Sequence, residues 1–479
     1  MNLADLHRFV GHKWDQDLVP RLIDYVKVPA KSPAFDASWA AHGHLAVVIK
    51  DAEAWSRAQA IEGLTIDVVA IDGRTPCLLF DVPATHGLGN DRTVLFYGHL
   101  DKQPEMVGWR DDLGPWKPVV EDGRLYGRGS ADDGYALYAA LTTIAAIDAQ
   151  GAPRPRCVGI IETCEESGSP DLPAYLELLT PRFGDVQLVV GLDSGCRNYD
   201  QLWVTTSLRG LVGGTLTVEI LSEGVHSGHA SGIVPSSFRI ARQLLNRLDD
   251  PGTGQVLLPE LQADIPPERL QQANEAGAIL GESVWREYPW VSCNHGPAGH
   301  AHAMPVTTDP VEAILNRTWR PALSVTGAAG FPAIDSAGNV LRPKSTFKLS
   351  MRIPPTVEAD KATWAMRRAL TESPPYNARV TFEPDWGATG WNAPETAPWL
   401  KQVLDTTSRQ VYGRDAAWVG EGGTIPFMNM LGERFPRAQF VITGVLGPHS
   451  NAHGPNEFLH IEYAKKLTAA IANVVTAVR

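Results

Sequence analysis

The sequence contains little cysteine, and its cysteines show no pattern of a covalent or metal framework. Five occur in 479 residues: Cys77, Cys157, Cys164, Cys196 and Cys293. Because their number is odd and no two form a Cys-x-x-Cys pair, neither a disulfide scaffold nor a zinc–thiolate site is indicated. Cys164 stands beside two glutamates, which invites a catalytic interpretation, but the expected role is that of a small buried side chain.

Long apolar runs and runs of basic residues are also missing. No stretch of 18 or more apolar residues occurs, and the first residues lack the apolar region of a signal peptide. The formal net charge is −12, and no Lys/Arg run offsets it, which argues against a nucleic-acid partner. We therefore expect no nucleic-acid or membrane partner, and a location in the reducing cytoplasm.

The chain is longer than one ordinary core, so two domains are expected. From Leu18 to Tyr175 helical patterns alternate with short apolar strands, as in α/β proteins. After Ser207 the order becomes strand, helix, strand, helix, strand, which predicts a small α+β insertion with elements over 210–220, 236–248, 346–353, 359–370 and 378–383. Residues 250–332 predict long loops and short helices within this insertion.

Side chains that can bind a metal follow several of the predicted strands. His99 and Asp101 follow the predicted strand 93–97, and Glu165 and Glu166 follow the strand 158–161. Asp193 follows the strand 188–192, and the loop 448–457 follows the strand 440–443. An open α/β sheet gathers the carboxyl ends of its strands into one crevice. These side chains are therefore expected to meet.

Asp132 lies in a glycine-rich segment before a predicted helix. Apolar residues over 137–147 give the helical pattern, which stops at Gly151. An aspartate in this position commonly caps a helix. A cap alone requires neither the adjacent Asp133 nor the cluster of glycines, so a functional role is the alternative.

Together these motifs resemble the carnosinase and aminoacylase family of dinuclear zinc peptidases, in that family's order and over nearly the whole chain. They are GHLDKQP (98–104), DGRLYGRGSADDG (122–134), EESGS (165–169), LDSG (192–195), VHSG (225–228), FKLSMRIP (347–354), GEGGTIP (420–426) and HGPNE (453–457). The closest resemblance is to the cytosolic nonspecific dipeptidase and carnosinase branch, because of GHLDKQP, the segment 109–112 and the chain length.

The resemblance implies two divalent metal ions per chain. It makes His99 and Asp193 ligands of one ion, Glu166 and His453 ligands of the other, and Asp132 the bridge between them. Histidine and carboxylate ligands without thiolate suit zinc, and also manganese or cobalt. Three carboxylates and one bridging hydroxide would balance the charge of the two ions.

The resemblance also gives roles to the neighbouring acids. Asp101 would fix the orientation of His99. Glu165 would be the general base that takes a proton from metal-activated water and passes it to the leaving amine. The bond between Asp132 and Asp133 would be cis, as in the family.

Substrate-binding residues are implied in the insertion and in the glycine-rich turn over 420–426. His226 matches the family residue that reaches over the metals of a partner subunit and stabilises the developing oxyanion, whereas His229 is expected to be a surface histidine. Arg352 matches the arginine that binds the substrate carboxylate, and Gly423 and Thr424 could hold the same group.

Two positions depart from the dipeptidase branch. Gly420 stands where an arginine is usual, and Gly134 stands where a lysine is usual. Both departures leave the metal ligands intact and bear on the identity of the substrate.

The sequence therefore predicts an α/β zinc-peptidase catalytic domain with a central, mostly parallel sheet flanked by helices, formed by residues 1–207 and 389–479. An inserted α+β, ferredoxin-like lid and dimerisation domain would occupy 208–388, with a hinge near Gly387, Gly390 and Pro394. The chain would form a homodimer through this domain.

The predicted function is metal-dependent hydrolysis of the amide bond of dipeptides or small peptides. One alternative is an aminoacylase or carboxypeptidase that acts on N-acyl amino acids. An alternative of another class is a catalytically silent homologue that binds peptides or serves as a scaffold. The complete set of ligands and the base disfavours that last interpretation.

Overall fold

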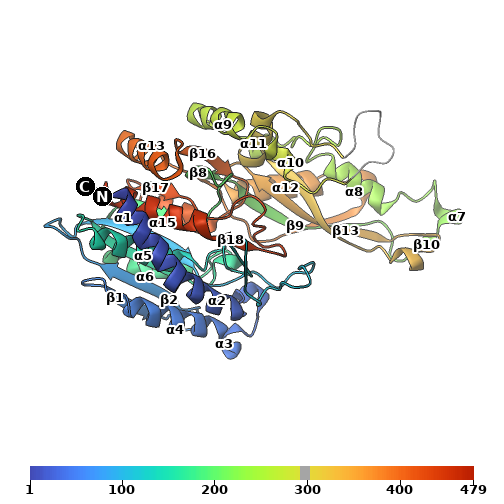
Figure 1. Ribbon diagram of the computed structural model, residues 1–479. Helices are drawn as coiled ribbons and strands as arrows, with labels where there is room; N and C mark the ends of the chain where they lie inside the picture. Colours follow the sequence, from blue (N-terminus) through green and yellow to red (C-terminus); the bar gives the residue numbers. More distant parts are fainter. Residues whose placement is uncertain (292–302, 479) are drawn as a thin grey trace. The chain divides into compact units, whose positions relative to one another are not determined.

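The computed structural model describes residues 1–291 and 303–478, and the chain divides into two compact units (Figure 1). The first unit contains residues 1–206, 393–419 and 430 onward, and the second contains residues 207–392 and 420–429. No helix of the described residues is both long enough and apolar enough to cross a bilayer. The four cysteines in the described ranges are buried and no disulfide joins them, and Cys293 lies outside those ranges.

A six-stranded mixed sheet forms the centre of the first unit. Its order is β1 (Thr65–Val69), β2 (Cys77–Val82), β6 (Arg156–Glu162), β3 (Arg92–His99), β7 (Asp185–Gly191) and β17 (Gln439–Ile442). β3 runs parallel to β6 and β7, and β17 runs parallel to β7. β2 runs antiparallel to both of its neighbours, β1 and β6. The apolar runs of β3, β6 and β7 are buried along nearly their whole length, as parallel strands covered on both faces require.

Helices flank this sheet, so the predicted α/β fold class is confirmed. α5 packs on β3 and β6, α4 packs on β1 and β2, and α15 packs against α1, α5 and α13. The helices of this unit are α1 (Leu3–Lys13), a π-helical turn (Trp14–Leu18), α2 (Val19–Lys27), α3 (Trp39–His42), α4 (His44–Arg57), α5 (Ala136–Ala149), α6 (Leu172–Phe183), α13 (Pro398–Tyr412) and α15 (Ile461–Thr476).

A small antiparallel sheet joins two distant parts of the first unit. Its order is β18 (Phe458–His460), β5 (Arg124–Tyr126) and β4 (Val119–Glu121). Phe458 pairs with Tyr126 in this sheet, and both pack against Leu113. The loop that precedes β18 and the loop that follows β5 are thereby brought together.

The second unit contains a four-stranded antiparallel sheet with helices α8 and α12 packed on it. The strand order is β11 (Ala322–Ala329), β13 (Lys344–Ile353), β9 (Gly210–Glu219) and β14 (Arg379–Pro384). Along the chain the order is β9, α8 (Ser237–Leu245), β11, β13, α12 (Ala359–Thr371) and β14, which is the element order of a ferredoxin-like βαββαβ arrangement.

The prediction of long loops and short helices over 250–332 missed a strand and a longer helix. This segment contains β11, the 14-residue helix α9 (Pro267–Leu280), α10 (Ser283–Arg286) and α11 (Pro310–Thr318). β11 consists mainly of small residues and is exposed over most of its length. It therefore lacks the alternation of apolar and polar residues that identifies a strand in a sequence.

The remaining elements are short. In the second unit they are β10 (Val225–His226), β12 (Val340–Leu341) and α7 (Ser227–Ala230). Four further elements lie at the boundaries between the units: β8 (Trp203–Leu208), β15 (Trp391–Asn392), β16 (Ala417–Glu421) and α14 (Pro426–Arg434). The three strands form a sheet with the order β15-β8-β16.

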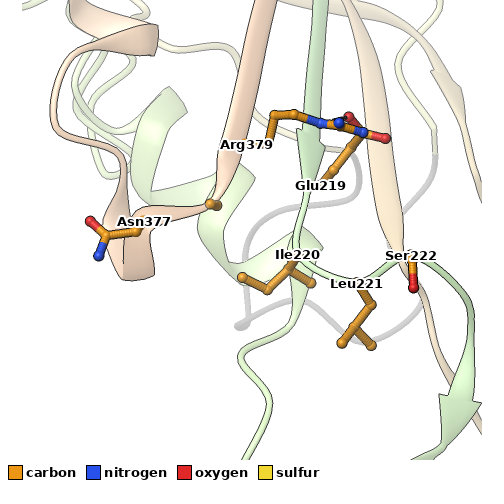
Figure 2. Close-up of a pocket in the computed structure, with 7 residues that line it drawn as sticks. Glu219, Ile220, Leu221, Ser222, Asn377 and Arg379 are labelled. Carbon is orange, nitrogen blue, oxygen red and sulfur yellow. Dashed lines mark hydrogen bonds and ion pairs between the residues drawn. The ribbon is translucent and has the colours of Figure 1, made fainter.

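A surface pocket of about 350 Å³ lies where β9 and β14 pair in the second unit. Glu219 and Arg379 form an ion pair at this pocket, and Ile220 and Leu221 continue its wall (Figure 2). None of the predicted site residues lines it.

Candidate metal centre

The predicted metal-binding side chains meet at one edge of the central sheet. β3 ends at His99, β7 ends two residues before Asp193, and β17 ends before the loop that carries His453. β6 ends at Glu162 and leads to a single 3-10 turn, Glu165–Ser167. Because these four strands are parallel, their carboxyl ends share one edge, as expected for a site in an open α/β sheet.

Asp132 lies between the other groups and presents one oxygen to each side. Its Oδ1 is 3.4 Å from His99 Nε2, and its Oδ2 is 3.0 Å from His453 Nε2. His99 Nε2 is 3.8 Å from Asp193 Oδ1, and His453 Nε2 is 3.3 Å from Glu166 Oε2. This is the arrangement that a carboxylate bridging two ions requires.

The side chains thus form two overlapping groups that could each hold a metal ion. One consists of His99, Asp132 and Asp193, and the other of Asp132, Glu166 and His453, with the ligand atoms of each group within 4.8 Å of one another. Apart from His453, whose side chain is 57% exposed, these residues are largely buried. Asp132 does not cap α5, because the N-cap position is Tyr135 and no side chain caps it.

Asp101 connects the two predicted metal groups through the main chain. His99 Nδ1 is 3.1 Å from the main-chain oxygen of Asp101 and 3.4 Å from its Oδ1. The carboxylate also accepts hydrogen bonds from the main-chain N–H of Glu165 (3.1 Å) and of Glu166 (3.0 Å). Asp101 therefore contacts the His99 ring and also fixes the turn that carries the two glutamates.

Asp133 and the start of α5 fix the other side of the centre. The Asp132–Asp133 peptide bond is cis, as expected. Asp133 Oδ2 accepts a hydrogen bond from the main-chain N–H of His99 (3.3 Å), and Tyr135 donates to the main-chain oxygen of Leu192 (2.5 Å). A Cβ at Gly98 would lie 2.9 Å from Asp133 Oδ2, so only glycine allows this approach.

The carboxylates of the centre are crowded together in a buried place. Burial raises the pKa of Glu165 and Glu166 well above the usual range, and neighbouring carboxylates add to the effect. Burial likewise raises the pKa of Asp193 to about 6. Burial opposes protonation of His99, but Asp193, Asp101 and Asp132 outweigh it and raise its pKa well above the usual value. The protein environment alone leaves this negative charge poorly compensated, and divalent cations would compensate it.

Two buried ligand atoms also fit a metal. His99 Nε2 and Glu166 Oε1 have no hydrogen-bond partner among the described residues, although both atoms are shielded from solvent. A buried polar atom without a partner is costly and calls for an explanation such as a bound ion. With a donor set of imidazoles and carboxylates, the residues fit zinc, manganese or cobalt.

The predicted substrate-binding residues lie in the second unit. Arg352, near the end of β13, donates from Nη1 to Thr424 Oγ1 (2.9 Å), and Thr424 donates to the main-chain oxygen of Arg209 (2.7 Å). Open space adjoins Gly423. His226 is exposed, and its Nδ1 accepts a hydrogen bond from the N–H of Gly228 (3.0 Å). These residues and the metal-binding groups thus belong to different units.

Both glycines at which the sequence is expected to depart from the dipeptidase branch lie in crowded places. A Cβ at Gly420 would collide with the Ser207 hydroxyl and lie 2.9 Å from Thr318 Cβ. A Cβ at Gly134 would overlap the Tyr25 ring and lie 2.7 Å from Gly129 O. No larger side chain fits at either position without a shift of its neighbours.

Three further residues support the centre, and no role was predicted for them from the sequence. Gln103 donates from its amide to Glu166 Oε2 (2.6 Å). Arg128 and Glu457 form a buried ion pair between the loops of Asp132 and His453. All three belong to motifs that carried the resemblance, but motif membership alone did not show which atoms they contact.

Comparisons with known proteins agree with this geometry. The model of peptidase family M20/M25/M40 matches residues 95–477. The chain belongs to this family. The predicted family and enzyme class, a metallopeptidase, are thereby confirmed.

Among its relatives in this peptidase family are two dipeptidases. Beta-Ala-His dipeptidase of Homo sapiens is 27% identical over 414 residues, which cover 80% of this chain and 75% of that protein. Cys-Gly metallodipeptidase DUG1 of Saccharomyces cerevisiae is 28% identical over 356 residues, which cover 70% and 69%. The solved structure of the dipeptidase Dug1p from Saccharomyces cerevisiae has a TM-score of 0.76 at 20% identity and covers 99% of this chain and 98% of that one. This likeness shows the same fold.

Proposed function

We propose that this peptidase hydrolyses the amide bond of dipeptides or small peptides with the help of two divalent ions. His99 and Asp193 would hold one ion, Glu166 and His453 the other, and Asp132 both. The observation that carries the proposal is the position of Asp132, whose two oxygens face His99 and His453 separately. The dipeptidase relatives favour this activity over that of an aminoacylase or carboxypeptidase.

Glu165 acts as the proton carrier in this proposal. When bound, the ions would polarise the scissile carbonyl and the attacking water. Glu165 belongs to neither group of candidate ligands, yet its main chain is held by Asp101 directly beside Glu166. Its raised pKa, caused mainly by burial, suits a group that takes a proton from water and returns it to the amine nitrogen of the leaving group.

Arg352, Gly423 and Thr424 bind the substrate carboxylate in this proposal. Thr424 uses its hydroxyl oxygen to orient the Arg352 guanidinium, while open space adjoins Gly423. Arg352 forms no ion pair with a carboxylate of the described residues. A guanidinium held in this way can form two parallel hydrogen bonds with a carboxylate.

We also propose that the active enzyme is a homodimer in which His226 completes the site of the partner. Because Nδ1 of His226 accepts from Gly228, the neutral ring carries its proton on Nε2, which is suited to donate to a developing oxyanion. β11 forms an exposed edge of the sheet in the second unit, and an edge strand can pair with a second copy. Mixing inactive His226→Ala with inactive Glu165→Gln should restore some activity through mixed dimers, whereas exchange of subunits without activity would contradict this assignment.

Further parts of the proposal concern domains, metal and location. Residues 1–207 and 389–479 would be the catalytic domain, and 208–388 the lid and dimerisation domain. Zinc is the proposed native metal, because imidazole and carboxylate ligands with open positions suit it. A cytoplasmic location is proposed because no disulfide joins the cysteines of the described residues. Small peptides, and no nucleic acid or membrane, are the proposed partners.

A comparison of two adjacent glutamates tests the proposed function. Glu165→Gln should lose several orders of magnitude in kcat on a dipeptide and still hold two ions per chain, because it removes only the proton carrier. Glu166→Gln, one residue away, should weaken the binding of one ion. Equal loss of metal in both variants would contradict the assigned roles.

A further inference from the structure

Arg128 connects the two loops that carry Asp132 and His453 with the segment that follows β3. It stands in the segment after β5, four residues before Asp132, and its side chain is 1% exposed. Its Nη2 donates to the main-chain oxygens of His453 (3.0 Å) and Gly454 (2.8 Å), and its Nε donates to that of Pro104 (3.2 Å). Pro104 follows Gln103, which holds Glu166.

Glu457 completes this connection from the opposite direction. Its Oε2 accepts from Arg128 Nη1 at 2.6 Å, and its side chain is fully buried. Its Oε1 accepts from the main-chain N–H groups of Gly129 (3.0 Å) and Ala131 (3.3 Å). Each partner of the ion pair therefore binds the main chain of the loop from which the other partner comes.

The loop of His453 needs such support. His453 has φ of 64°, a left-handed conformation that is unfavourable for a residue with a side chain. Such a conformation persists only where the surroundings determine it. The two hydrogen bonds from Arg128 to His453 O and Gly454 O hold the main chain at this point.

We propose that Arg128 and Glu457 are positioning residues that set the affinity of the second ion, the one assigned to Glu166 and His453. They touch neither the ion nor the substrate and act through the main chain of the His453 loop. The first ion depends less on them, because His99 and Asp193 lie on β3 and after β7, which the central sheet holds in place. This inference rests on the proposed function, since it assumes that the centre binds two ions.

The double change Arg128→Met with Glu457→Gln tests the proposal. It removes both charges together, so no buried charge is left unpaired, and replacement of a buried ion pair by neutral groups is often tolerated by the fold. The glutamine oxygen can still accept from Gly129 and Ala131, whereas the donors to His453 and Gly454 are lost. A role in stability alone predicts normal metal binding once the variant folds, and a positioning role predicts a selective loss.

Metal titration of the folded variant, by competition with a chelating indicator, gives the readout. The affinity for the second ion should fall roughly 10–100-fold, the usual effect of losing a residue that supports a metal ligand, while the affinity for the first ion is unchanged. The step that disappears in His453→Ala identifies the second ion. Arg128→Lys retains the charge and should bind the second ion more tightly than the double variant.

The matched control is a second ion pair of the same unit. Arg154 and Asp148 pair at 2.7 Å at the far end of α5 from Asp132, and Arg154→Met with Asp148→Asn should leave both affinities unchanged. Unchanged binding of both ions in the Arg128 and Glu457 variant, or equal weakening of the two, would overturn the proposal. If the double variant does not fold, Arg128→Lys is titrated against wild type: weaker binding of the second ion alone supports the proposal, and unchanged or equally weakened binding of both ions overturns it. A wild-type protein that binds no metal would instead refute the proposed function.

Discussion

Replacement of Asp101 by asparagine should disable the turn that carries Glu165 and Glu166. Asp101 is fully buried, and its two carboxylate oxygens accept one main-chain N–H each, from Glu165 and Glu166. An asparagine has only one oxygen, so one buried N–H would lose its acceptor and face another donor. Asp101→Asn removes a charge-assisted hydrogen bond and leaves that N–H unpaired.

The size of the effect follows from these two contacts. A lost hydrogen bond to a charged group and an unpaired buried donor together cost about 2–4 kcal/mol. Because the turn can move while the sheet stays folded, we expect most of this cost in catalysis. Each 1.36 kcal/mol of lost transition-state stabilisation is tenfold in rate, so kcat should fall roughly 30- to 1,000-fold.

Steady-state hydrolysis of a dipeptide, at saturating zinc and with metal content measured in parallel, is the assay. Asp148→Asn is the control, because Asp148 also accepts from two donors, both on Arg154, but lies at the opposite end of α5. If Asp101→Asn keeps the wild-type kcat with both ions bound, Asp101 does not hold the catalytic turn and the argument is wrong.

Three further predictions concern single side chains. Burial raises the pKa of Glu162 to about 7, so the contribution of this side chain to stability is present below its unfolded pKa and is lost as pH rises through 7. Glu162→Gln should therefore gain stability relative to wild type by on the order of 3 kcal/mol between pH 4 and pH 8. A constant difference between the two proteins in urea unfolding would contradict this. Arg352→Ala and amidation of the substrate C-terminus should have similar, non-additive effects on kcat/KM, whereas additive losses would place Arg352 elsewhere. Gly134→Ala should cost about 1–3 kcal/mol of unfolding free energy because its Cβ overlaps the Tyr25 ring, and denaturant unfolding with no loss would show that the ring moves freely.

The sequence predicted the elements that have strong local patterns. β3, β6, β7 and β17 are short apolar runs that end at or just before polar residues, and this pattern is visible without the structure. The same strand ends predicted that metal-binding side chains would meet at one edge. β11 was missed because its small, exposed residues on a sheet edge leave no periodic signal.

Contacts between distant parts of the chain could not be predicted from the sequence. Asp101 bonds to a turn that lies 64 residues later, and Arg128 pairs with a residue 329 positions away. Such contacts depend on how the strands of the sheets pair. The residues around Asp101 or Arg128 do not by themselves determine this pairing. The motifs indicated which residues matter for the site, and the structure shows how they are held.

The most direct test of the account is the metal content of the purified chain measured together with its activity. We predict two divalent ions per chain by elemental analysis, loss of dipeptide hydrolysis on treatment with a strong chelator, and recovery with zinc, manganese or cobalt. Full activity in protein shown by elemental analysis to be free of metal would contradict the central claim.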